Sequence, residues 1–459
     1  MKPTYRIAIV GSGPSGMYAL EHLLHNKQAN VEIDLFERLP VPWGLVRYGV
    51  APDHPEKKLI STRLYNNLIS RRNVRFFGNV EIGKDISHPE LAQWYDGVIY
   101  ASGANADRKL NIPGEELPGS WSAREFVAWY NGHPDFSHLD FDLSTDRAVI
   151  VGNGNVALDV ARILMLPVEE LNKTDIASHA IAALSKSNIR EVVILGRRGY
   201  QNGAYHNPEL EEFSYLDDVA ILVEDPDFSN VDVADLTHLD WETRRKVATL
   251  KKLSNRKIAG AGKRIIFSFL SSPLALKGDR RLEEVLINHN GAESDIAEQT
   301  NKDEIGATSN NKTSSITAGI LFRSIGYRGT PFPELPFDQD NGVIENLKGR
   351  ISNQGDAVTG AYVTGWIKRG ARGVIGTNKQ CAEETVSCLL DDLASASTSN
   401  SQALRSDLVL EQIKTKQPAF VSLESWLSID RAEKEKGALR NQPRSKICSI
   451  EEMLEVARS

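Results

Sequence analysis

Short apolar runs alternate with longer amphipathic segments over the first two hundred residues of the chain. Four such runs, rich in Ile, Val and Leu, are residues 6–10, 31–37, 148–151 and 191–195. Runs of this length and composition are typical of buried parallel strands. The first and third runs lead through a glycine-rich turn into a helical segment, which after the third run is predicted at 156–165. This order predicts two βαβ units and therefore an α/β fold with two Rossmann-like domains.

The first glycine turn contains Gly11, Gly13 and Gly16, between a strand and its helix. In such a turn the first glycine permits the tight bend, the second lets a pyrophosphate approach the backbone, and the third lets the helix pack on the strand. The pyrophosphate then binds the unpaired N–H groups at the helix N-terminus. Glu37 ends the next strand. Its carboxylate would accept hydrogen bonds from ribose hydroxyls and repel a ribose 2′-phosphate.

The second glycine turn contains Gly152, Gly154 and a small third residue, Ala157. At the place that matches the carboxylate of the first unit stand Arg197 and Arg198. Two guanidinium groups there favour a 2′-phosphate, which they bind through charge-assisted, bidentate hydrogen bonds. A solvated turn is the alternative interpretation of the pair. The opposite charges at the two sites are typical of an enzyme that holds FAD and NADP(H) together.

The order of the strands places the second unit inside the first. Residues 319–327 read as a strand that leaves the second domain, and residues 360–366 as the return to the first. We therefore expect a discontinuous FAD-binding domain of residues 1–106 and 326–459, with an NADP-binding domain of residues 107–325 inserted into it.

Further segments are predicted from local composition. They are a short strand in 96–104, a helix at 122–130, a polar surface hairpin tip or insertion at 291–316, a linker or loop at 394–406, and a helical C-terminal piece.

The composition of the chain argues against several classes of protein. The chain has 459 residues and a formal net charge of −7, which argues against nucleic acid as the main partner. No apolar run approaches the roughly 20 residues that span a bilayer, and no signal peptide precedes the first strand, so we expect a cytoplasmic protein. Cys381, Cys388 and Cys448 form no CxxC pair. This argues against structural zinc, a disulfide framework and a redox disulfide, and Cys381 and Cys388 are expected to pack in a helical core.

Three longer motifs are more specific than the glycine turns. Residues 42–55, 152–162 and 365–376 read PWGLVRYGVAPDHP, GNGNVALDVAR and GWIKRGARGVIG. With them the chain closely resembles adrenodoxin reductase and its bacterial ferredoxin–NADP reductase relatives, from about residue 4 to the C-terminus. The resemblance implies a flavin disulfide reductase-like architecture without the redox CxxC. It also implies a monomeric FAD enzyme that takes hydride from NADPH and passes single electrons to a [2Fe–2S] or related ferredoxin. Members of the family often have Pro-Thr where this chain has Ala371-Arg372, which adds a positive charge close to both cofactors.

The resemblance also assigns binding residues, position by position. For FAD they are, with the glycines of the first turn, Ser15, Glu37, Leu45, Ile82, Trp366, Gly373, Val374 and Ile375. For NADP(H) they are Arg108, Gly152, Asn153, Gly154, Asn155, Val156, Arg197, Arg198, Glu209 and Gly373. Core packing is the alternative role for Trp366, although the glycine-rich run around it favours a ligand.

His54 and Glu212 are the polar candidates near the nicotinamide by analogy with the family. His54 would mediate proton movement, because an imidazole titrates near neutral pH. The alternative is that His54 only holds the turn formed by residues 53–55. The alternative for Glu212 is that it is an ordinary carboxylate on the surface of a helix.

Arg244, Arg245, Lys251 and Lys252 form a basic run that would dock an acidic ferredoxin, with a solvated helix face as the alternative. An NADPH diaphorase or quinone reductase is the second enzyme hypothesis, because that activity needs only an accessible reduced flavin. A flavin monooxygenase is disfavoured because no added substrate domain is visible. A flavin-bound sensor without turnover is disfavoured because the second glycine turn and its arginine pair, Arg197 and Arg198, are complete.

Overall fold

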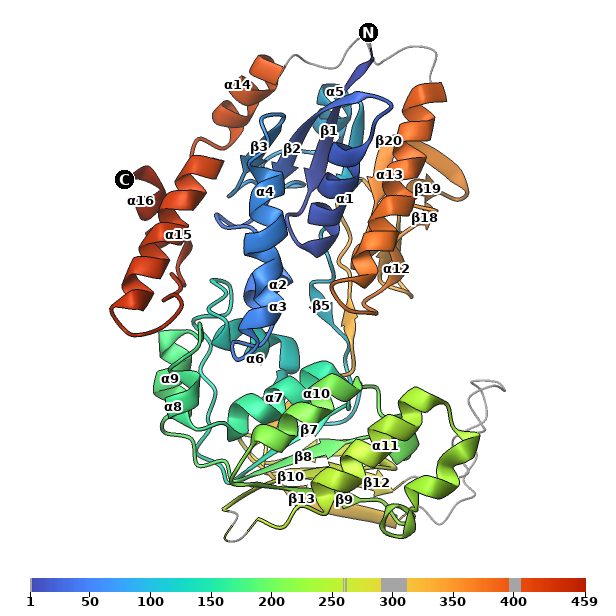
Figure 1. Ribbon diagram of the computed structural model, residues 1–459, viewed down its shortest axis with the longest axis vertical. Coiled ribbons are helices and arrows are strands. Elements are labelled where there is room, and N and C mark those ends of the chain that lie inside the picture. Colours follow the sequence, from blue (N-terminus) through green and yellow to red (C-terminus); the bar gives the residue numbers. More distant parts are fainter. Residues whose placement is uncertain (1, 259, 261, 290–311, 396–405) are drawn as a thin grey trace. The chain divides into compact units, whose positions relative to one another are not determined.

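The computed structural model describes residues 2–258, 260, 262–289, 312–395 and 406–459 (Figure 1). The chain divides into two units, each with its own sheet. The first contains Met1–Arg108, Asn131–Pro134 and Gly326–Ser459, and the second contains Lys109–Tyr130 and Asp135–Ile325. The predicted domains differ from this division at residues 107–108 and 131–134, which group with the first unit.

A seven-stranded sheet forms the centre of the first unit, in the order β18-β19-β20-β4-β1-β2-β3. Its strands are β1 (Thr4–Val10), β2 (Asn30–Phe36), β3 (Val74–Phe77), β4 (Gly97–Tyr100), β18 (Asn346–Leu347), β19 (Arg350–Asn353) and β20 (Asp356–Val363). The pairs from β20 to β3 are parallel, whereas β18, β19 and β20 pair antiparallel. The predicted strand within 96–104 is thus β4, which joins β1 to the returning strand β20.

Two apolar layers cover this sheet. Because side chains alternate along a strand, Ile7 and Ile9 point into one layer and Ala8 and Val10 into the other. The first layer contains residues of α1 (Pro14–His25), α13 (Thr377–Ser395) and α15 (Leu423–Ala438). The second contains residues of α5 (His88–Trp94) and α14 (Ser406–Lys416). Figure 1 shows α1 and α13 side by side.

The remaining elements of the first unit are short. They are α2 (Leu45–Tyr48), α3 (Pro55–Ile60), the π-helix η1 (Ser61–Tyr65), α4 (Asn66–Ile69), α12 (Trp366–Arg369), α16 (Ile450–Arg458), and the strand pairs β5 (Ala106–Asp107) with β15 (Tyr327–Arg328) and β16 (Phe337–Asp338) with β17 (Val343–Ile344). Together with α14 and α15, α16 confirms the predicted helical C-terminal piece.

The second unit is built on a six-stranded parallel sheet in the order β6-β14-β7-β8-β10-β9. Its strands are β6 (Ser120–Ser122), β7 (Arg147–Val151), β8 (Glu191–Leu195), β9 (Val219–Glu224), β10 (Lys263–Ser268) and β14 (Ile320–Arg323). Its helices are α6 (Ala123–Tyr130), α7 (Asn155–Met165), α8 (Val168–Leu171), α9 (Ser178–Leu184), α10 (Asn207–Glu211), α11 (Trp241–Ser254), and the 3-10 helices η2 (Tyr200–Asn202), η3 (Glu212–Tyr215), η4 (Phe228–Asn230) and η5 (Val233–His238). The helices predicted at 122–130 and 156–165 are confirmed as α6 and α7.

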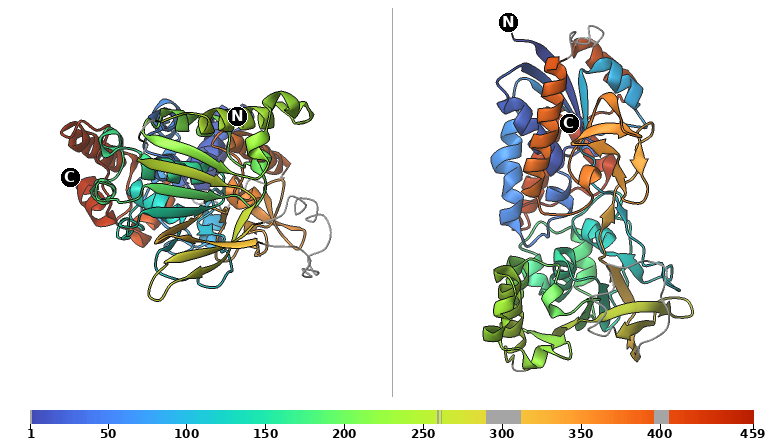
Figure 2. Two further views of the ribbon diagram at one scale, coloured as in Figure 1. Left: turned by 90° about the horizontal axis from the view of Figure 1, so that it is seen from below. Right: turned by 90° about the vertical axis from the view of Figure 1, so that its right-hand side faces the viewer.

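An antiparallel sheet covers one face of the six strands. It consists of β11 (Ser271–Lys277), β12 (Glu284–His289) and β13 (Lys312–Thr317). Val149 and Val193 pack in one cluster with Leu276, Val285 and Ile287 of that sheet. Both views of Figure 2 show α11 on the opposite side of the six strands.

Two predicted segments fall largely outside the described residues. Of the polar segment 291–316, residues 291–311 lie outside them, and residues 312–316 belong to β13. Of the predicted linker 394–406, residues 396–405 lie outside them. Cys381 and Cys388 are buried on α13, as predicted, and all three cysteines are free thiols. Among the described residues, no helix has both the length and the apolar character needed to cross a membrane.

Candidate dinucleotide-binding sites

The first glycine turn has no room for side chains. Gly11 has a φ of 107°, and a Cβ there would lie 2.6 Å from the carbonyl oxygen of Ala101. A Cβ on Gly16 would lie 1.9 Å from the carbonyl oxygen of Gly11. Gly13 caps α1 without a side-chain hydrogen bond, and the first turn of the helix carries no acidic residue. The N–H groups at this positive end of α1 are therefore available to an anion such as a pyrophosphate.

A second glycine faces the first turn from another part of the chain. A Cβ on Gly44 would lie 3.0 Å from the Cα of Gly13. Gly44 has a φ of 48° and Trp43 a φ of 89°, so the backbone is left-handed at both residues. The left-handed conformation is unusual for a residue as large as Trp43. The result is a cradle of bare backbone, and it fits a diphosphate group that must approach both segments closely.

Glu37 lies where the sequence places it, directly after β2. One carboxylate oxygen accepts hydrogen bonds from the Ser12 N–H at 3.1 Å and the Ser12 hydroxyl at 2.6 Å. The other accepts from the N–H of Leu39 at 3.2 Å. The carboxylate is thus fixed at the carboxyl edge of the sheet, beside the glycine turn, and can accept further bonds from ribose hydroxyls.

The chain returns to the N-terminus of α1 after β20. Gly365, which caps α12, has a φ of 79°, and a Cβ there would lie 2.0 Å from the Ser15 hydroxyl oxygen. That hydroxyl donates to Asn378 of α13 at 3.1 Å. The structure therefore brings Ser15 and the segment after β20 together, although they lie about 350 residues apart in sequence.

Helix α12 and the segment that joins it to α13 contain the other predicted FAD residues of the C-terminal half. Trp366 donates its indole N–H to the carbonyl oxygen of Arg372 at 3.1 Å and stacks on Tyr327. Gly373 has a φ of 81°, and the N–H of Val374 donates to the Thr377 hydroxyl at 3.2 Å. These bonds shape the chain just before the N-terminus of α13.

Apolar side chains are left exposed around these turns. Val374 is 50% exposed and Leu45 is 43% exposed, whereas Ile82 is buried in the core with Phe77 and Val80. Large apolar side chains that remain exposed beside a bare-backbone cradle fit a ligand with an apolar ring system.

The second glycine turn repeats the geometry of the first. Gly152 also has a φ of 107°, and a Cβ there would lie 2.3 Å from the carbonyl oxygen of Ser324. Gly154 caps α7 and has a φ of −86°, and among the described residues no atom lies within 4 Å of the place that a Cβ would occupy. Val156 is half-buried, and Ala157, the small third residue, is fully buried against the sheet.

The two asparagines of this turn have a role that sequence reasoning missed. The side-chain oxygen of Asn155 accepts the N–H of His206 at 2.8 Å, and that of Asn153 accepts the N–H of Ala204 at 3.4 Å. They tie the glycine turn to the loop that leads into α10, which carries Glu209. No local periodicity indicates such a contact, because the partners lie about 50 residues apart.

Arg197 and Arg198 are exposed in the turn after β8, as the sequence predicts. The backbone of this turn is held by hydrogen bonds from residues 270–271, on each side of Arg197 in sequence. The carbonyl oxygen of Gly196 accepts the N–H of Ser271 at 2.9 Å, and that of Arg198 accepts the N–H of Leu270 at 3.2 Å. The guanidinium groups are thus presented from a rigid base. Arg108, the other predicted arginine, is exposed and belongs to the first unit.

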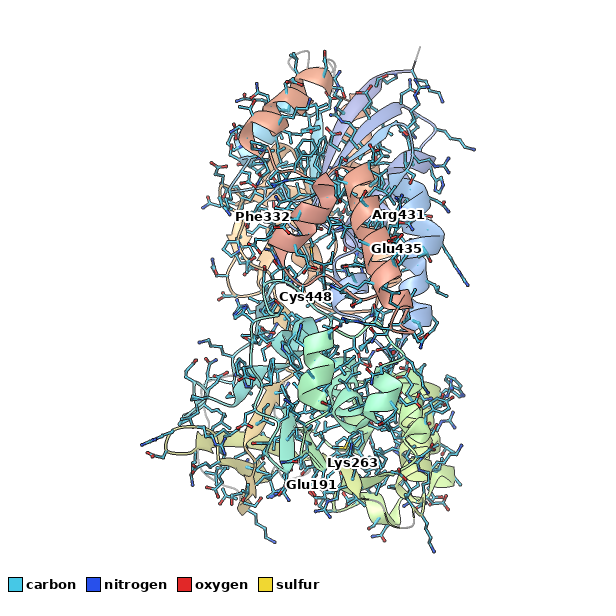
Figure 3. All side chains as sticks on the ribbon, turned by 90° about the vertical axis from the view of Figure 1, so that its left-hand side faces the viewer. Glu191, Lys263, Phe332, Arg431, Glu435 and Cys448 are labelled. Carbon is cyan, nitrogen blue, oxygen red and sulfur yellow. The ribbon has the colours of Figure 1, made fainter. Side chains whose placement is uncertain are left out.

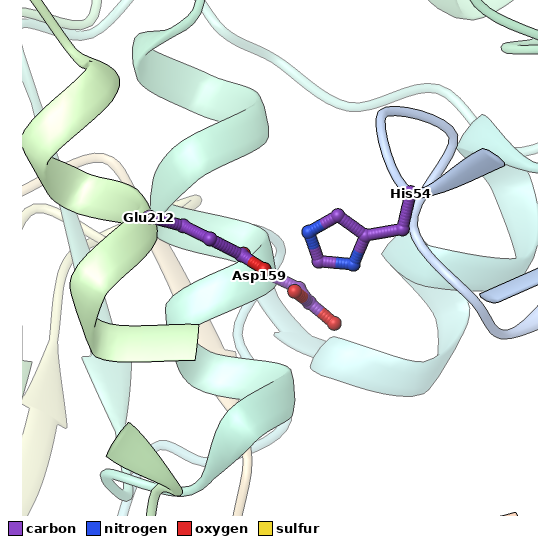
Figure 4. A group of neighbouring side chains, drawn as sticks. All are labelled: His54, Asp159 and Glu212. Atoms are coloured by element: carbon purple, nitrogen blue, oxygen red, sulfur yellow. The ribbon is translucent and has the colours of Figure 1, made fainter. Parts of the chain in front are cut away.

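Glu212, drawn in Figure 4, begins η3 and is held by a buried arginine. Arg162 of α7, whose side chain is 4% exposed, pairs with Asp159 at 2.9 Å and with Glu212 at 2.9 Å. Glu212 is therefore not a plain surface carboxylate, and that alternative is wrong. The i, i+3 spacing of Asp159 and Arg162 on a helix is a sequence signal for their ion pair. The pair of Arg162 with Glu212 has no such spacing.

His54, also drawn in Figure 4, is buried and caps α3. Its backbone N–H donates to the carbonyl oxygen of Ala51 at 3.1 Å, in the turn that leads into α3. The Lys57 ammonium lies 3.2 Å from its Nδ1. Because an ammonium group can only donate, Nδ1 is the acceptor in this bond.

The predicted docking residues on α11 have mixed environments. Arg245 pairs with Glu211 at 3.0 Å and lies over the Trp241 ring, and Lys251 donates to the carbonyl oxygens of two residues of η4. Arg244 is half-buried, and Lys252 is exposed. Docking by this run stays a prediction.

Comparisons with known proteins show the class to which the chain belongs. The family model of the pyridine nucleotide-disulphide oxidoreductases matches residues 5–197. The fold and the glycine turns are those of a pyridine nucleotide-disulphide oxidoreductase. The predicted α/β fold class is confirmed.

Relatives define the family more closely. NADPH-ferredoxin reductase FprA of Mycobacterium tuberculosis is 41% identical, over 99% of this chain and 99% of the relative. The mitochondrial NADPH:adrenodoxin oxidoreductase of Arabidopsis thaliana is 39% identical, over 98% of this chain and 95% of the relative. The solved structure of Mycobacterium tuberculosis FprA in complex with NADPH covers 100% of both chains at 40% identity, with a TM-score of 0.90. This chain belongs to the NADPH–ferredoxin reductase family, and the resemblance seen in its motifs is confirmed.

Proposed function

We propose that this chain is an FAD-containing NADPH–ferredoxin reductase whose electron acceptor is a small iron–sulfur ferredoxin. The single observation that carries the proposal is the pairing of two glycine turns with opposite charges, Glu37 beside one and Arg197 and Arg198 beside the other. FAD, when bound, accepts a hydride from NADPH and releases the electrons one at a time. We assign FAD to the first unit and NADP(H) to the second. A monomer remains the working expectation.

The residues of the first unit would position the flavin nucleotide. The N–H groups at the start of α1 bind the pyrophosphate in the cradle between Gly13 and Gly44. The Glu37 carboxylate accepts hydrogen bonds from the ribose hydroxyls, and Val374 and Leu45 lose exposed apolar surface to the ligand. The protein already holds these groups in place, so binding of FAD would need little further ordering of the chain.

The residues of the second unit would select the nicotinamide nucleotide. Arg197 and Arg198 provide bidentate, charge-assisted bonds to the 2′-phosphate, and the N-terminus of α7 binds the pyrophosphate. Asn153 and Asn155 keep the loop before α10, the helix that carries Glu209, beside the glycine turn. We propose that this loop forms one wall of the NADP(H) site.

His54 is our candidate for a proton-handling residue. The bond between its Nδ1 and the Lys57 ammonium holds the buried imidazole in one orientation, and an imidazole can both donate and accept a proton. For Glu212 the ion pair with Arg162 holds the carboxylate in one place. We propose an electrostatic role for it rather than proton transfer.

The test of the proposed function is NADPH-driven reduction of cytochrome c, with and without a [2Fe–2S] ferredoxin, over a salt series. We expect a large ferredoxin-dependent gain that falls as salt is added, since charged docking surfaces are screened. Dye reduction by NADPH with no gain from any ferredoxin would instead favour a diaphorase. No reduction of the flavin by NADPH would contradict both enzyme assignments.

The docking run is tested within the same assay. Lys252→Glu and Arg244→Glu should lower the ferredoxin-dependent rate and its salt dependence, and should leave dye reduction unchanged. Lys186→Glu, an exposed lysine outside the run, is the matched control.

A further inference from the structure

Helix α15 places two buried side chains, Trp426 and Glu433, on one face. They are seven residues apart, which is two helical turns, so they lie one above the other. Both contact residues 43–47, the segment that contains Gly44 of the pyrophosphate cradle. Arg431 and Glu435 of the same helix, labelled in Figure 3, are exposed.

The segment that α15 contacts is strained. Trp43 is in the left-handed region with a φ of 89°, and Gly44 follows with a φ of 48°. A bulky residue stays in this region only where its surroundings hold it there. The strained turn matters because it brings Gly44 against Gly13, where a Cβ on Gly44 would lie 3.0 Å from the Gly13 Cα. If the turn relaxed, the cradle would change its width.

Trp426 holds the strained residue by ring packing. The Trp43 ring lies between Tyr65, at a centroid distance of 5.6 Å, and Trp426, at 6.4 Å with an interplanar angle of 82°. Edge-to-face packing of this kind is favourable and directional. The Trp43 side chain is therefore packed against two aromatic rings while its backbone is in the left-handed region.

Glu433 holds the other end of the segment by charge. Its fully buried carboxylate accepts hydrogen bonds from Arg47, from Arg444 at 2.9 Å and from the N–H of Ile447 at 2.8 Å. Burial opposes the charge, but Arg47 and Arg444 outweigh it and hold the pKa of Glu433 below its ordinary value. The Arg47 guanidinium also lies over the Trp426 ring, at 5.6 Å. Arg47 is thus fixed by both residues of α15.

A third bond from the C-terminal piece reaches the same residue. The buried Lys446 ammonium donates to the carbonyl oxygen of Arg47 at 3.3 Å. Side chain and backbone of Arg47 are therefore both bound to residues 423–446, which lie almost 400 positions further along the chain.

We propose that α15 is a positioning element of the FAD site, in which Trp426 and Glu433 hold the strained Trp43-Gly44 turn against Gly13. The inference rests on the proposed function, since it concerns the affinity of the first unit for FAD. Neither residue touches the reacting atoms of the flavin in this proposal. Both act through the turn, so their loss should speed the release of FAD from a protein that is still folded.

The experiment measures FAD release from purified holoenzyme, as the rise of free-flavin fluorescence, at temperatures where far-UV circular dichroism shows intact secondary structure. We expect Glu433→Gln and Trp426→Leu each to release FAD about tenfold faster than wild type or more, the size of one lost charge-assisted bond or ring contact. Trp426→Phe, which keeps an aromatic ring, should restore most of the wild-type rate. The visible circular dichroism of the bound flavin should change in the first two variants.

Glu435→Gln is the matched control, because it removes an exposed carboxylate from the same helix and should leave release within about twofold of wild type. If Glu433→Gln does not fold, the comparison of Trp426→Leu with Trp426→Phe decides the question. Unchanged release, or release that occurs only together with global unfolding, would overturn the inference. A wild-type protein that binds no FAD would overturn the proposed function itself, whereas FAD-bound variants with wild-type release rates overturn only the role of α15.

Discussion

Gly16 and Gly11 approach so closely that a Cβ on Gly16 would lie 1.9 Å from the carbonyl oxygen of Gly11. The contact is between backbones, which cannot rotate away as a side chain would. Gly16, the third glycine of the first glycine turn, therefore has a packing role inside the turn.

Gly16→Ala should prevent the first turn from closing. Because the clash is with backbone, we expect a cost of about 1–3 kcal/mol or more, together with loss of bound FAD. Gly262→Ala is the control, since within the described part of the chain a Cβ at that exposed position would approach only the tip of Arg190, at 3.9 Å. The flavin content and thermal midpoint of the two purified variants check the prediction, and a Gly16→Ala protein with full flavin content would contradict it.

Replacement of Arg197 and Arg198 by alanine should weaken binding of NADPH and change that of NADH little. Each charge-assisted bond to a 2′-phosphate contributes about 1.5–3 kcal/mol. Dissociation constants for both nucleotides, measured by calorimetry, are the test. Arg190→Ala removes an exposed arginine at the opposite end of β8 and should have no effect. Equal losses for NADPH and NADH would show that the 2′-phosphate assignment is wrong.

Arg162→Met should destabilise the second unit, because it leaves two partly buried carboxylates, Asp159 and Glu212, without their shared cation. Removal of one member of a buried ion-pair network costs about 3–5 kcal/mol. Hydrogen exchange of the α7 amides reports this free energy locally. Lys173→Met removes an exposed pair with Glu170 and should cost at most about 1 kcal/mol. A similar effect of both substitutions would contradict the buried network.

Cys448 should react slowly with alkylating reagents in the folded protein. Burial raises the pKa of its thiol from the ordinary 9.0 to about 11, although Lys446 lowers it in part. Since the folded pKa lies above the unfolded one, the contribution of this thiol to stability is complete below pH 9 and is lost as the pH rises through 11.

Mass spectrometry of the Cys448 peptide after iodoacetamide treatment at pH 8 measures this reactivity. The thiolate is the reactive form, so we expect alkylation at least about tenfold slower in the native protein than in urea. Equal rates in the two states would contradict the raised pKa.

The residues of the two fingerprints could be predicted because their chemistry is local. Gly152 has its positive φ within a strand–turn–helix of consecutive residues, and Arg197 follows the end of β8 directly. The ends of neighbouring parallel strands share one edge of a sheet, so spacing along the chain was enough to pair each turn with its charged partner. The Asn155–His206 bond had no such signal, because it depends on where a loop about 50 residues away packs.

The sequence by itself determined the two βαβ units, the sign of charge beside each turn and the family to which the chain belongs. Each of these depends on residues within one supersecondary unit, where periodicity and turn chemistry act directly. Only the tertiary structure decided that Gly44 faces Gly13, that Gly365 lies against Ser15, and that Glu433 binds Arg47. These contacts join distant segments through a left-handed backbone and buried charge, which become favourable only when the whole unit packs around them.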